Sequence, residues 1–314
     1  MSHLPALFNI LLLSLAAGLG TSLGGLIAIV RRPGRRMFGA LMGMAAGVMI
    51  SLAFLELVNQ AWEMGGFWSA SIGFGLGAGL MFVLDYFLPH IRFGERETAH
   101  GEPLPSAPPC GEAPPQAQHL RYRAGGRRTA PAEAAPAPLP HLHRHRGRPH
   151  RRRLWQLRFD SGVLDVRLLK TGILLLVGIT LHNIPEGFAV GAGYLHAPRF
   201  GLFIAIAILL HNIPEGIATA LPLCRCGVCR WDALKAATLS GLTEPFGALI
   251  AALFLGSFDA LVPGGLAFAG GVMVFITLDE LIPTAREHGH EHYTALGIIA
   301  GSLFVFVLSG VFGV

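Results

Sequence analysis

The hexapeptide His-Asn-Ile-Pro-Glu-Gly occurs twice in this 314-residue chain, at 182–187 and at 211–216. In a helix, the four-residue spacing of His182 and Glu186 puts the imidazole and the carboxylate on one face, and the second copy repeats that spacing. The asparagine beside each histidine can add an amide oxygen. Imidazole, amide and carboxylate groups suit zinc, and also iron(II), manganese(II), cobalt(II) and cadmium(II). The repeat therefore predicts a site for divalent cations.

Both copies lie in the middle of long apolar runs, at 168–193 and 200–223. A third carboxylate, Glu244, lies near the midpoint of another run, 233–256, and is also followed by a proline. Polar side chains at the centre of a membrane span are costly and indicate a function. Hydrogen bonds between helices explain a single histidine or asparagine well. They explain two full motifs and a glutamate at one depth poorly, whereas shared cations would offset the cost of burying three carboxylates.

Each copy of the motif contains a proline, Pro185 and Pro214. Because proline has no N–H to donate, the carbonyls of Leu181 and Leu210 lose their usual partners, and kinks are expected. Freed carbonyls are tolerated within a membrane where the helices line a cavity.

The composition is that of a membrane protein, with a mean hydropathy of +0.54, 52% hydrophobic residues and only 14% charged residues. A run of about 20 apolar residues can cross a hydrocarbon core roughly 30 Å thick. Eight runs have this length: about 5–29, 37–59, 66–88, 168–193, 200–223, 233–256, 262–284 and 293–313. The sequence therefore predicts an all-α membrane protein with eight transmembrane helices.

Residues 91–166 separate two membrane halves. This segment is rich in Pro, Arg and His and has no sustained apolar periodicity, so it predicts a disordered cytoplasmic loop. The domains are accordingly transmembrane helices 1–3 in 1–90, the loop, and helices 4–8 in 167–314, which carry the metal site. The histidines of 141–150 could bind metal loosely, or the interleaved arginines could make a solvated or lipid-facing basic segment.

Positive charge is distributed unevenly between the two sides of the predicted bundle. With eight spans and an outside N-terminus, only Arg199 of the 24 Lys and Arg residues falls in an outside connection. This bias follows the positive-inside rule. We therefore expect a multi-pass protein of the cell (inner) membrane, with both termini outside and the 91–166 loop in the cytoplasm. The net charge of +5 thus reports topology, and nucleic acid is not an expected partner.

The four cysteines are too few for a disulfide framework, and on this topology they face a reducing cytoplasm. Cys224, Cys226 and Cys229 could form a thiolate zinc site. However, Arg225 lies among them and no fourth ligand is evident, which argues against structural zinc.

Three other features each have two open interpretations. Met49, near the midpoint of span two, is either a packing residue or a thioether ligand. Asp279 and Glu280, towards the inner side of span seven, could form an exit relay or cap the bundle. The histidines of 288–292 could collect metal or simply form a polar turn.

At the paired motifs the chain resembles the ZIP (Zrt-, Irt-like) family of divalent metal transporters, in particular its bacterial ZupT/GufA-like branch. The similarity covers all eight spans and includes Ala45-Ala-Gly-Val-Met49 in span two and Leu278-Asp-Glu-Leu-Ile-Pro283 in span seven. The resemblance implies a ZIP-type bundle in a 3+2+3 arrangement and a homodimer in the lipid bilayer. It also implies inward transport by an elevator-like motion of spans one, four, five and six against the others.

The resemblance further implies a binuclear metal site. Carried over residue by residue, its ligands are His182, Asn183, Glu186, His211, Asn212, Glu215 and Glu244, with Met49 as a possible ligand from span two. Glu186 and Glu215 would bridge the two cations. The metal is the substrate: zinc first, with iron(II), manganese, cobalt or cadmium also suited by a set in which five of seven ligands are oxygen.

The predicted function is transport of divalent cations into the cytoplasm, and not catalysis. A zincin helix needs His-Glu-x-x-His, whereas each copy here reads His-Asn-x-x-Glu and lacks that general base. No Walker-type Gly-Lys-Ser/Thr sequence is present, so ATP is not expected to drive transport. A gated divalent-cation channel built on the same ligands stays open as an alternative, and an intramembrane metalloenzyme is the weaker one.

Overall fold

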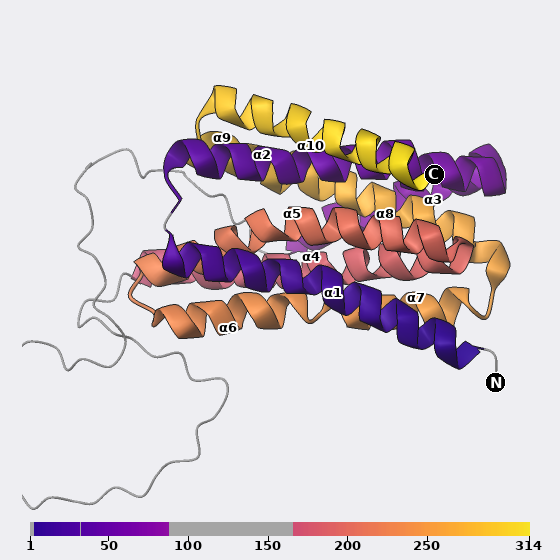
Figure 1. The fold of residues 1–314 in the computed structure, drawn as a ribbon, viewed down its shortest axis with the longest axis horizontal. Coiled ribbons are helices and arrows are strands. Elements are labelled where there is room, and N and C mark those ends of the chain that lie inside the picture. The colour runs from indigo at the N-terminus through magenta and orange to yellow at the C-terminus, as the bar shows by residue number, and fades with distance from the viewer. Residues whose placement is uncertain (1–2, 32, 88–165) are drawn as a thin grey trace, which may run out of the picture.

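The computed structural model describes residues 3–31, 33–87 and 166–314, and this part of the chain is helical throughout, joined by short turns (Figure 1). The predicted loop at 91–166 lies outside the described residues, apart from Val166, which begins a helix. The elements are α1 (His3–Val30), α2 (Arg35–Ser51), η1 (Leu52–Val58), α3 (Asn59–Phe87), α4 (Val166–His196), α5 (Pro198–Arg225), α6 (Arg230–Gly241), α7 (Glu244–Leu255), η2 (Asp259–Leu261), α8 (Val262–Ile276), η3 (Thr277–Leu281), α9 (Ile282–His288) and α10 (Glu291–Phe312).

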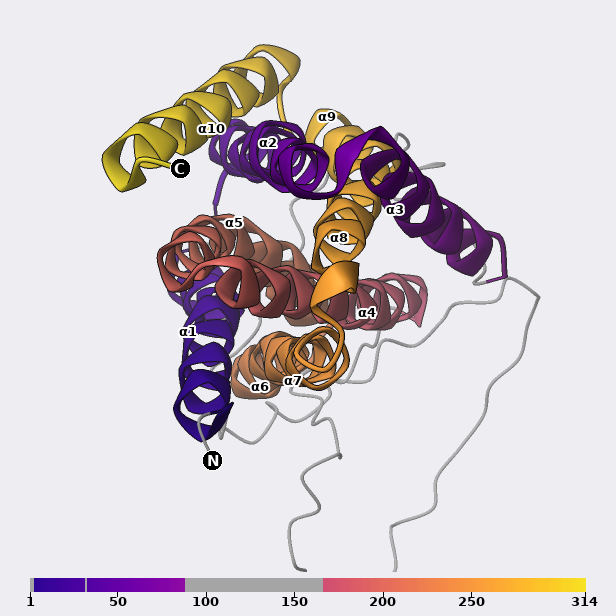
Figure 2. The ribbon, with the colours of Figure 1, turned by 90° about the vertical axis from the view of Figure 1, so that its right-hand side faces the viewer.

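Six helical segments among the described residues are long and apolar enough to cross a membrane. One of them, Arg35–Tyr86, covers 52 residues and joins α2, η1 and α3. Its backbone leaves the helical region at Gly66, where φ is 70° and ψ is −177°. Glycine adopts this conformation without strain because it has no Cβ. The chain changes direction there, within α3, so that the part of α3 after Gly66 runs as a rod separate from α2 (Figure 2).

The helices pack in two groups. One contains α1, α4, α5, α6 and α7, and the other contains α2, α3, α8, α9 and α10. The groups meet mainly where α4 packs on α8 and where α5 packs on α2 (Figure 2). The first group consists of the predicted spans one, four, five and six, so the packing division follows the expected grouping of spans. The motion of one group against the other stays a prediction.

The prolines of the repeat lie inside helices that continue through them. Pro185 lies within α4 and Pro214 within α5, and neither helix is interrupted at the motif. Each helix therefore continues, although its proline cannot donate a backbone hydrogen bond. The interruption falls in the sixth apolar run instead.

The sixth run is broken between α6 and α7, and Glu244 is the first residue of α7. Pro245 lies in the first turn of α7, where a missing N–H costs nothing because that group has no partner within the helix. The hydroxyl of Thr243 lies 2.7 Å from the carbonyl oxygen of Ser240 and 3.0 Å from that of Thr180 in α4. This side chain thus supports the break and ties it to α4. The sequence pointed to the proline here but not to the break.

The last residue of each hexapeptide is a glycine, and both glycines are points of close helix contact. A Cβ at Gly187 would lie 1.9 Å from the carbonyl oxygen of Glu244, and one at Gly216 would lie 2.0 Å from that of Thr21. Small residues allow helix backbones to approach closely in membranes. The motif glycines therefore let α4 meet the start of α7 and let α5 meet α1 beside the polar residues.

Candidate metal centre

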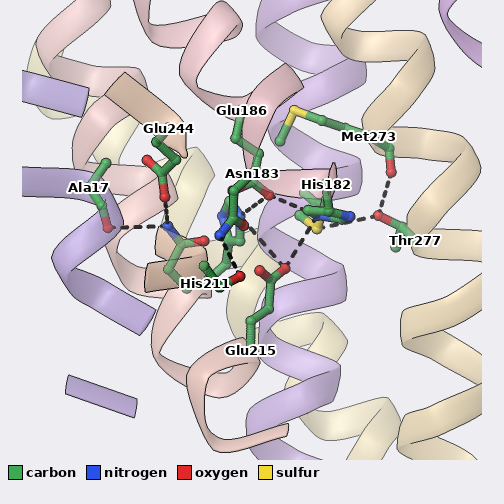
Figure 3. A network of polar contacts seen from close by, with 12 residues as sticks. Ala17, His182, Asn183, Glu186, His211, Glu215, Glu244, Met273 and Thr277 are labelled. Atoms are coloured by element: carbon green, nitrogen blue, oxygen red, sulfur yellow. Dashed lines mark hydrogen bonds and ion pairs between the residues drawn. The ribbon is translucent and has the colours of Figure 1, made fainter. Parts of the chain in front are cut away.

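The histidines and glutamates of the two motifs converge on one another between α4 and α5 (Figure 3). Glu186 Oε1 lies 2.8 Å from His182 Nε2 and 2.8 Å from His211 Nε2. Glu215 Oε1 lies 3.4 Å from His182 Nε2 and 4.0 Å from His211 Nε2. All four side chains are buried. One carboxylate oxygen therefore lies against both imidazoles, with the second carboxylate facing the same pair.

Several buried oxygen atoms around this cluster accept no hydrogen bond from the described part of the chain. They are Glu186 Oε2, both carboxylate oxygens of Glu215, Asn183 Oδ1, Asn212 Oδ1 and Glu244 Oε2. Buried polar atoms almost always have partners, and leaving them unpaired is costly. His182, Glu186 and Glu215 also offer ligand atoms that all lie within 4.8 Å of one another. Unpaired oxygens beside close-set ligand atoms are the environment that a divalent cation fits.

Asn212 and Glu244 lie together on the side of the cluster that faces α1. Asn212 Nδ2 donates to the carbonyl oxygen of Ala17 at 3.1 Å and also to Glu244 Oε1 (Figure 3). Glu244 is fully buried at the N-terminus of α7, where the helix dipole favours a carboxylate. The structure therefore brings the third glutamate next to the repeat through Asn212.

Asn183 is fully buried on α4, and its Nδ2 lies 3.3 Å from the hydroxyl oxygen of Ser240 on α6.

Met49 is fully buried on α2, and its sulfur lies 3.6 Å from the hydroxyl oxygen of Thr277. That hydroxyl donates to the carbonyl oxygen of Met273 at 2.7 Å. Met49 is therefore packed within the second helix group, where its sulfur contacts a hydroxyl. Its role as a metal ligand stays a prediction.

A pocket adjoins the cluster between the two helix groups. Its lining includes His182 and Glu215 at one end and Asp279, Glu280 and Glu287 from η3 and α9. If Asp279 and Glu280 form an exit relay for metal, they must face a space that also reaches the cluster. The pocket is such a space, so it favours the relay over a role in capping the bundle. Glu287 is a further pocket carboxylate that the sequence did not single out.

The other candidate metal groups do not assemble in the described part of the chain. Cys224 and Cys226 are buried and form no disulfide, whereas Cys229 is disulfide-bonded and offers no thiolate. The expectation that every cysteine is reduced was therefore wrong at Cys229. The rings of His290 and His292 lie 5.7 Å apart, which leaves the polar-turn interpretation in place, and the side chain of His288 lies outside the described residues.

Two groups beside the centre were missed by sequence reasoning. Ser240 contacts Asn183, and its position four residues before Glu244 was a usable signal, because it puts a small polar residue near the same depth. Ala17 contributes a backbone carbonyl, for which no residue type is a signal.

The ZIP Zinc transporter family model matches residues 3–309. The chain is 35% identical to the zinc transporter ZupT of Corynebacterium efficiens over 312 residues, which cover 94% of this chain and 96% of that protein. It is 36% identical to the zinc transporter ZupT of Corynebacterium glutamicum, with 94% and 98% covered. It is 33% identical to the zinc transporter ZTP29 of Arabidopsis thaliana, with 92% and 89% covered. The family match, spanning nearly the whole chain and both copies of the motif, leads to one conclusion: this chain belongs to the ZIP zinc transporter family.

Proposed function

We propose that this protein transports divalent cations, zinc first, across the membrane into the cytoplasm. The observation that carries the proposal is the buried cluster of two imidazoles and two carboxylates, with carboxylate oxygens that accept no hydrogen bond from described residues. The relatives named as zinc transporters support zinc as the substrate. Iron(II), manganese, cobalt and cadmium are further candidates, because the ligand set is rich in oxygen.

Two cations are proposed to share the cluster, with Glu186 and Glu215 as bridges. His182 and His211, with Met49 as a possible third ligand, would serve one cation. Asn183, Asn212 and Glu244 would serve the other, on the side facing α1. The two amide oxygens and the second oxygen of Glu244 that lack hydrogen bonds in the described chain support this division.

Eight membrane spans in a 3+2+3 arrangement are part of the proposal. The break at Gly66 divides the 52-residue segment into two spans, which raises six candidates to seven. Helix α4 supplies the eighth, because its 31 residues extend about 46 Å at about 1.5 Å per residue. Both termini lie at one end of the bundle, as an even number of crossings requires (Figure 1).

Aromatic residues support the placement of the bundle in a bilayer. Trp62, Phe67 and Trp68 are exposed around the turn at Gly66, and Trp231 is exposed at the start of α6. Tryptophan and other aromatic residues concentrate at the two membrane interfaces. We place the N- and C-termini outside the cell membrane, with 91–166 in the cytoplasm, and expect a homodimer.

Transport is proposed to follow alternating access, in which the group of α1 and α4–α7 moves against the other helices. Cations would enter from outside, bind at the midplane and leave through the pocket past Asp279 and Glu280. Protonation of the ligands weakens cation binding and would assist release.

A carrier is favoured over a channel by contacts at the end of the bundle where the termini lie. The Arg199 guanidinium of α5 donates to the carbonyl oxygen of Val311 at 3.5 Å and lies 6.0 Å from the centroid of the Phe312 ring in α10. The rings of Phe203 and Phe312 are 6.0 Å apart. These contacts join the two helix groups at one end while the pocket extends towards the other, as expected for one state of a carrier.

Replacing His211 by alanine tests the proposal. In proteoliposomes we expect saturable zinc uptake by the wild type and at least about tenfold lower uptake efficiency for His211→Ala, because one cation loses an imidazole ligand. His196→Ala is the matched control, since His196 packs on Phe200 at the end of α4 away from the cluster. Equal uptake by His211→Ala and wild type would mean that the repeat is structural. Uptake that never saturates would favour the channel.

Deletion of 100–150 is expected to leave zinc uptake in place, because every proposed ligand lies outside that segment. The measurement is initial uptake rate per molecule of protein inserted in the vesicles. Complete loss of uptake by a deletion variant that inserts normally would show that the loop is needed for transport itself.

A further inference from the structure

The amide of Asn212 has a fixed direction in the centre. Its Nδ2 lies 3.1 Å from the carbonyl oxygen of Ala17, and a carbonyl oxygen can only accept a hydrogen bond. The NH₂ group must therefore face α1, and Oδ1 must face away from Ala17. Asn212 Oδ1 is buried and accepts no hydrogen bond from described residues, so it is free for a cation.

The amide of Asn183 has a partner that does not fix its direction by itself. Its Nδ2 lies 3.3 Å from the hydroxyl oxygen of Ser240, which is 1% exposed. A hydroxyl can donate or accept, so this contact is compatible with either orientation of the amide. The direction of the amide therefore depends on which group accepts the hydroxyl proton of Ser240.

Thr180 on α4 settles the direction. Its Oγ1 lies 2.5 Å from the carbonyl oxygen of Leu176 and 3.2 Å from Ser240 Oγ. The single hydroxyl proton of Thr180 goes to the carbonyl, because the carbonyl cannot donate one. Thr180 Oγ1 must then accept from Ser240, and Ser240 must in turn accept from the NH₂ group of Asn183. The three hydrogen bonds run in one direction, from the amide to the carbonyl of Leu176.

We infer that Thr180 and Ser240 are positioning residues that turn the Asn183 amide oxygen towards the transported cation. This inference rests on the proposed function, in which Asn183 is a ligand. Asn183 Oδ1 is buried and accepts no hydrogen bond from the described chain, as an oxygen held ready for a cation would be. An inverted amide would present its NH₂ group, which cannot bind a cation.

The inferred role also bears on metal selectivity. Manganese(II) prefers oxygen ligands, whereas zinc is also well served by imidazole. Loss of one oriented amide oxygen is therefore expected to weaken manganese uptake more than zinc uptake. The pair of hydroxyls thus contributes to the breadth of the substrate range.

Thr180→Val is the decisive variant, because it keeps the side-chain volume and removes the acceptor for Ser240. The Ser240 hydroxyl can then donate to Asn183, and the amide can invert. We expect the KM for zinc uptake to rise about tenfold, the size typical of groups that orient a metal ligand, with little change in maximal rate. Ser240→Ala should also raise the KM for zinc uptake. Thr180→Ser keeps the hydroxyl and should have the wild-type KM.

Thr238→Val is the matched control. Its hydroxyl donates to the carbonyl oxygen of Leu234 at 2.9 Å within α6, so the control removes a comparable helix hydroxyl away from Asn183. Its KM is expected to equal that of the wild type.

The Asn183→Ala background separates positioning from a structural role. If Thr180 acts through Asn183, Thr180→Val adds no further change in KM once the amide is gone. The same fold-change in both backgrounds, or no change in KM in the wild-type background, would overturn the inference. Failure of the proposed function would look different, because zinc uptake by His211→Ala and by Asn183→Ala would then equal that of the wild type.

Discussion

Glu186→Gln is expected to abolish saturable zinc uptake. The variant removes the charge from the carboxylate whose Oε1 lies 2.8 Å from both imidazoles, the position from which it would bridge two cations. Removing a group that only orients a metal ligand lowers metal affinity about 10- to 100-fold, so removing a bridging ligand should have a larger effect. The glutamine side chain has the same shape and can still hydrogen-bond to a histidine. We therefore expect the protein to insert and unfold much like the wild type.

The measurement is zinc uptake in proteoliposomes, normalised to inserted protein. Glu63→Gln is the control, because Glu63 is an exposed carboxylate in α3 that pairs with Asn59 and lies away from the cluster. Near-normal uptake by Glu186→Gln would contradict the bridging role and with it the two-cation site.

Gly187→Ala is expected to lower the stability of the bundle and to disturb the metal centre. A methyl group at this position would lie 1.9 Å from the carbonyl oxygen of Glu244, so α4 and the start of α7 would have to separate. Overpacking of this kind typically costs about 1–3 kcal/mol. The same shift would move Glu244, and we expect zinc uptake to fall more than about tenfold, as for other changes that misplace a ligand.

Thermal unfolding in detergent and uptake measured on the same preparation check this result. Gly79→Ala is the control, because a Cβ at this position in α3 meets nothing within 4 Å. Alanine is a better helix former than glycine by up to about 1 kcal/mol, so the control should be as stable as the wild type or slightly more so. Wild-type unfolding and uptake for Gly187→Ala would show that the close approach is not needed.

The features that the sequence predicted correctly depend on strong local signals. The chain is helical wherever the structure describes it, because runs of about 20 apolar residues in a membrane must satisfy their backbone groups internally. The four-residue spacing of His182 and Glu186 placed both on one face of α4, and the structure brings them to the second copy of the motif. Equal depth of Glu244 predicted its proximity to the repeat, which it reaches through Asn212.

The features that the sequence did not predict depend on contacts between segments. Kinks were expected at Pro185 and Pro214, and both helices continue through these residues. The break between α6 and α7 was not predicted; the hydroxyl of Thr243 there contacts the carbonyl oxygens of Ser240 in α6 and Thr180 in α4. The π-helical turns η1 and η3 have no simple residue signature. The role of Gly187 became clear only with Glu244 against it, because a glycine in an apolar run is compatible with many kinds of packing.

The contribution of α1 to the centre is made by its backbone. The carbonyl oxygen of Ala17 receives the Asn212 amide, and that of Thr21 fills the space left by Gly216. Substituting a side chain leaves a carbonyl in place, and position 17 is already alanine. An alanine scan would therefore leave both carbonyls in place. It would register this part of α1 only through Gly18 and Gly20, where a Cβ would lie 2.2 Å from the carbonyl oxygen of Gly241 and 2.4 Å from that of Leu209. Mutational maps of such bundles will understate any helix that contributes to a site through its peptide groups.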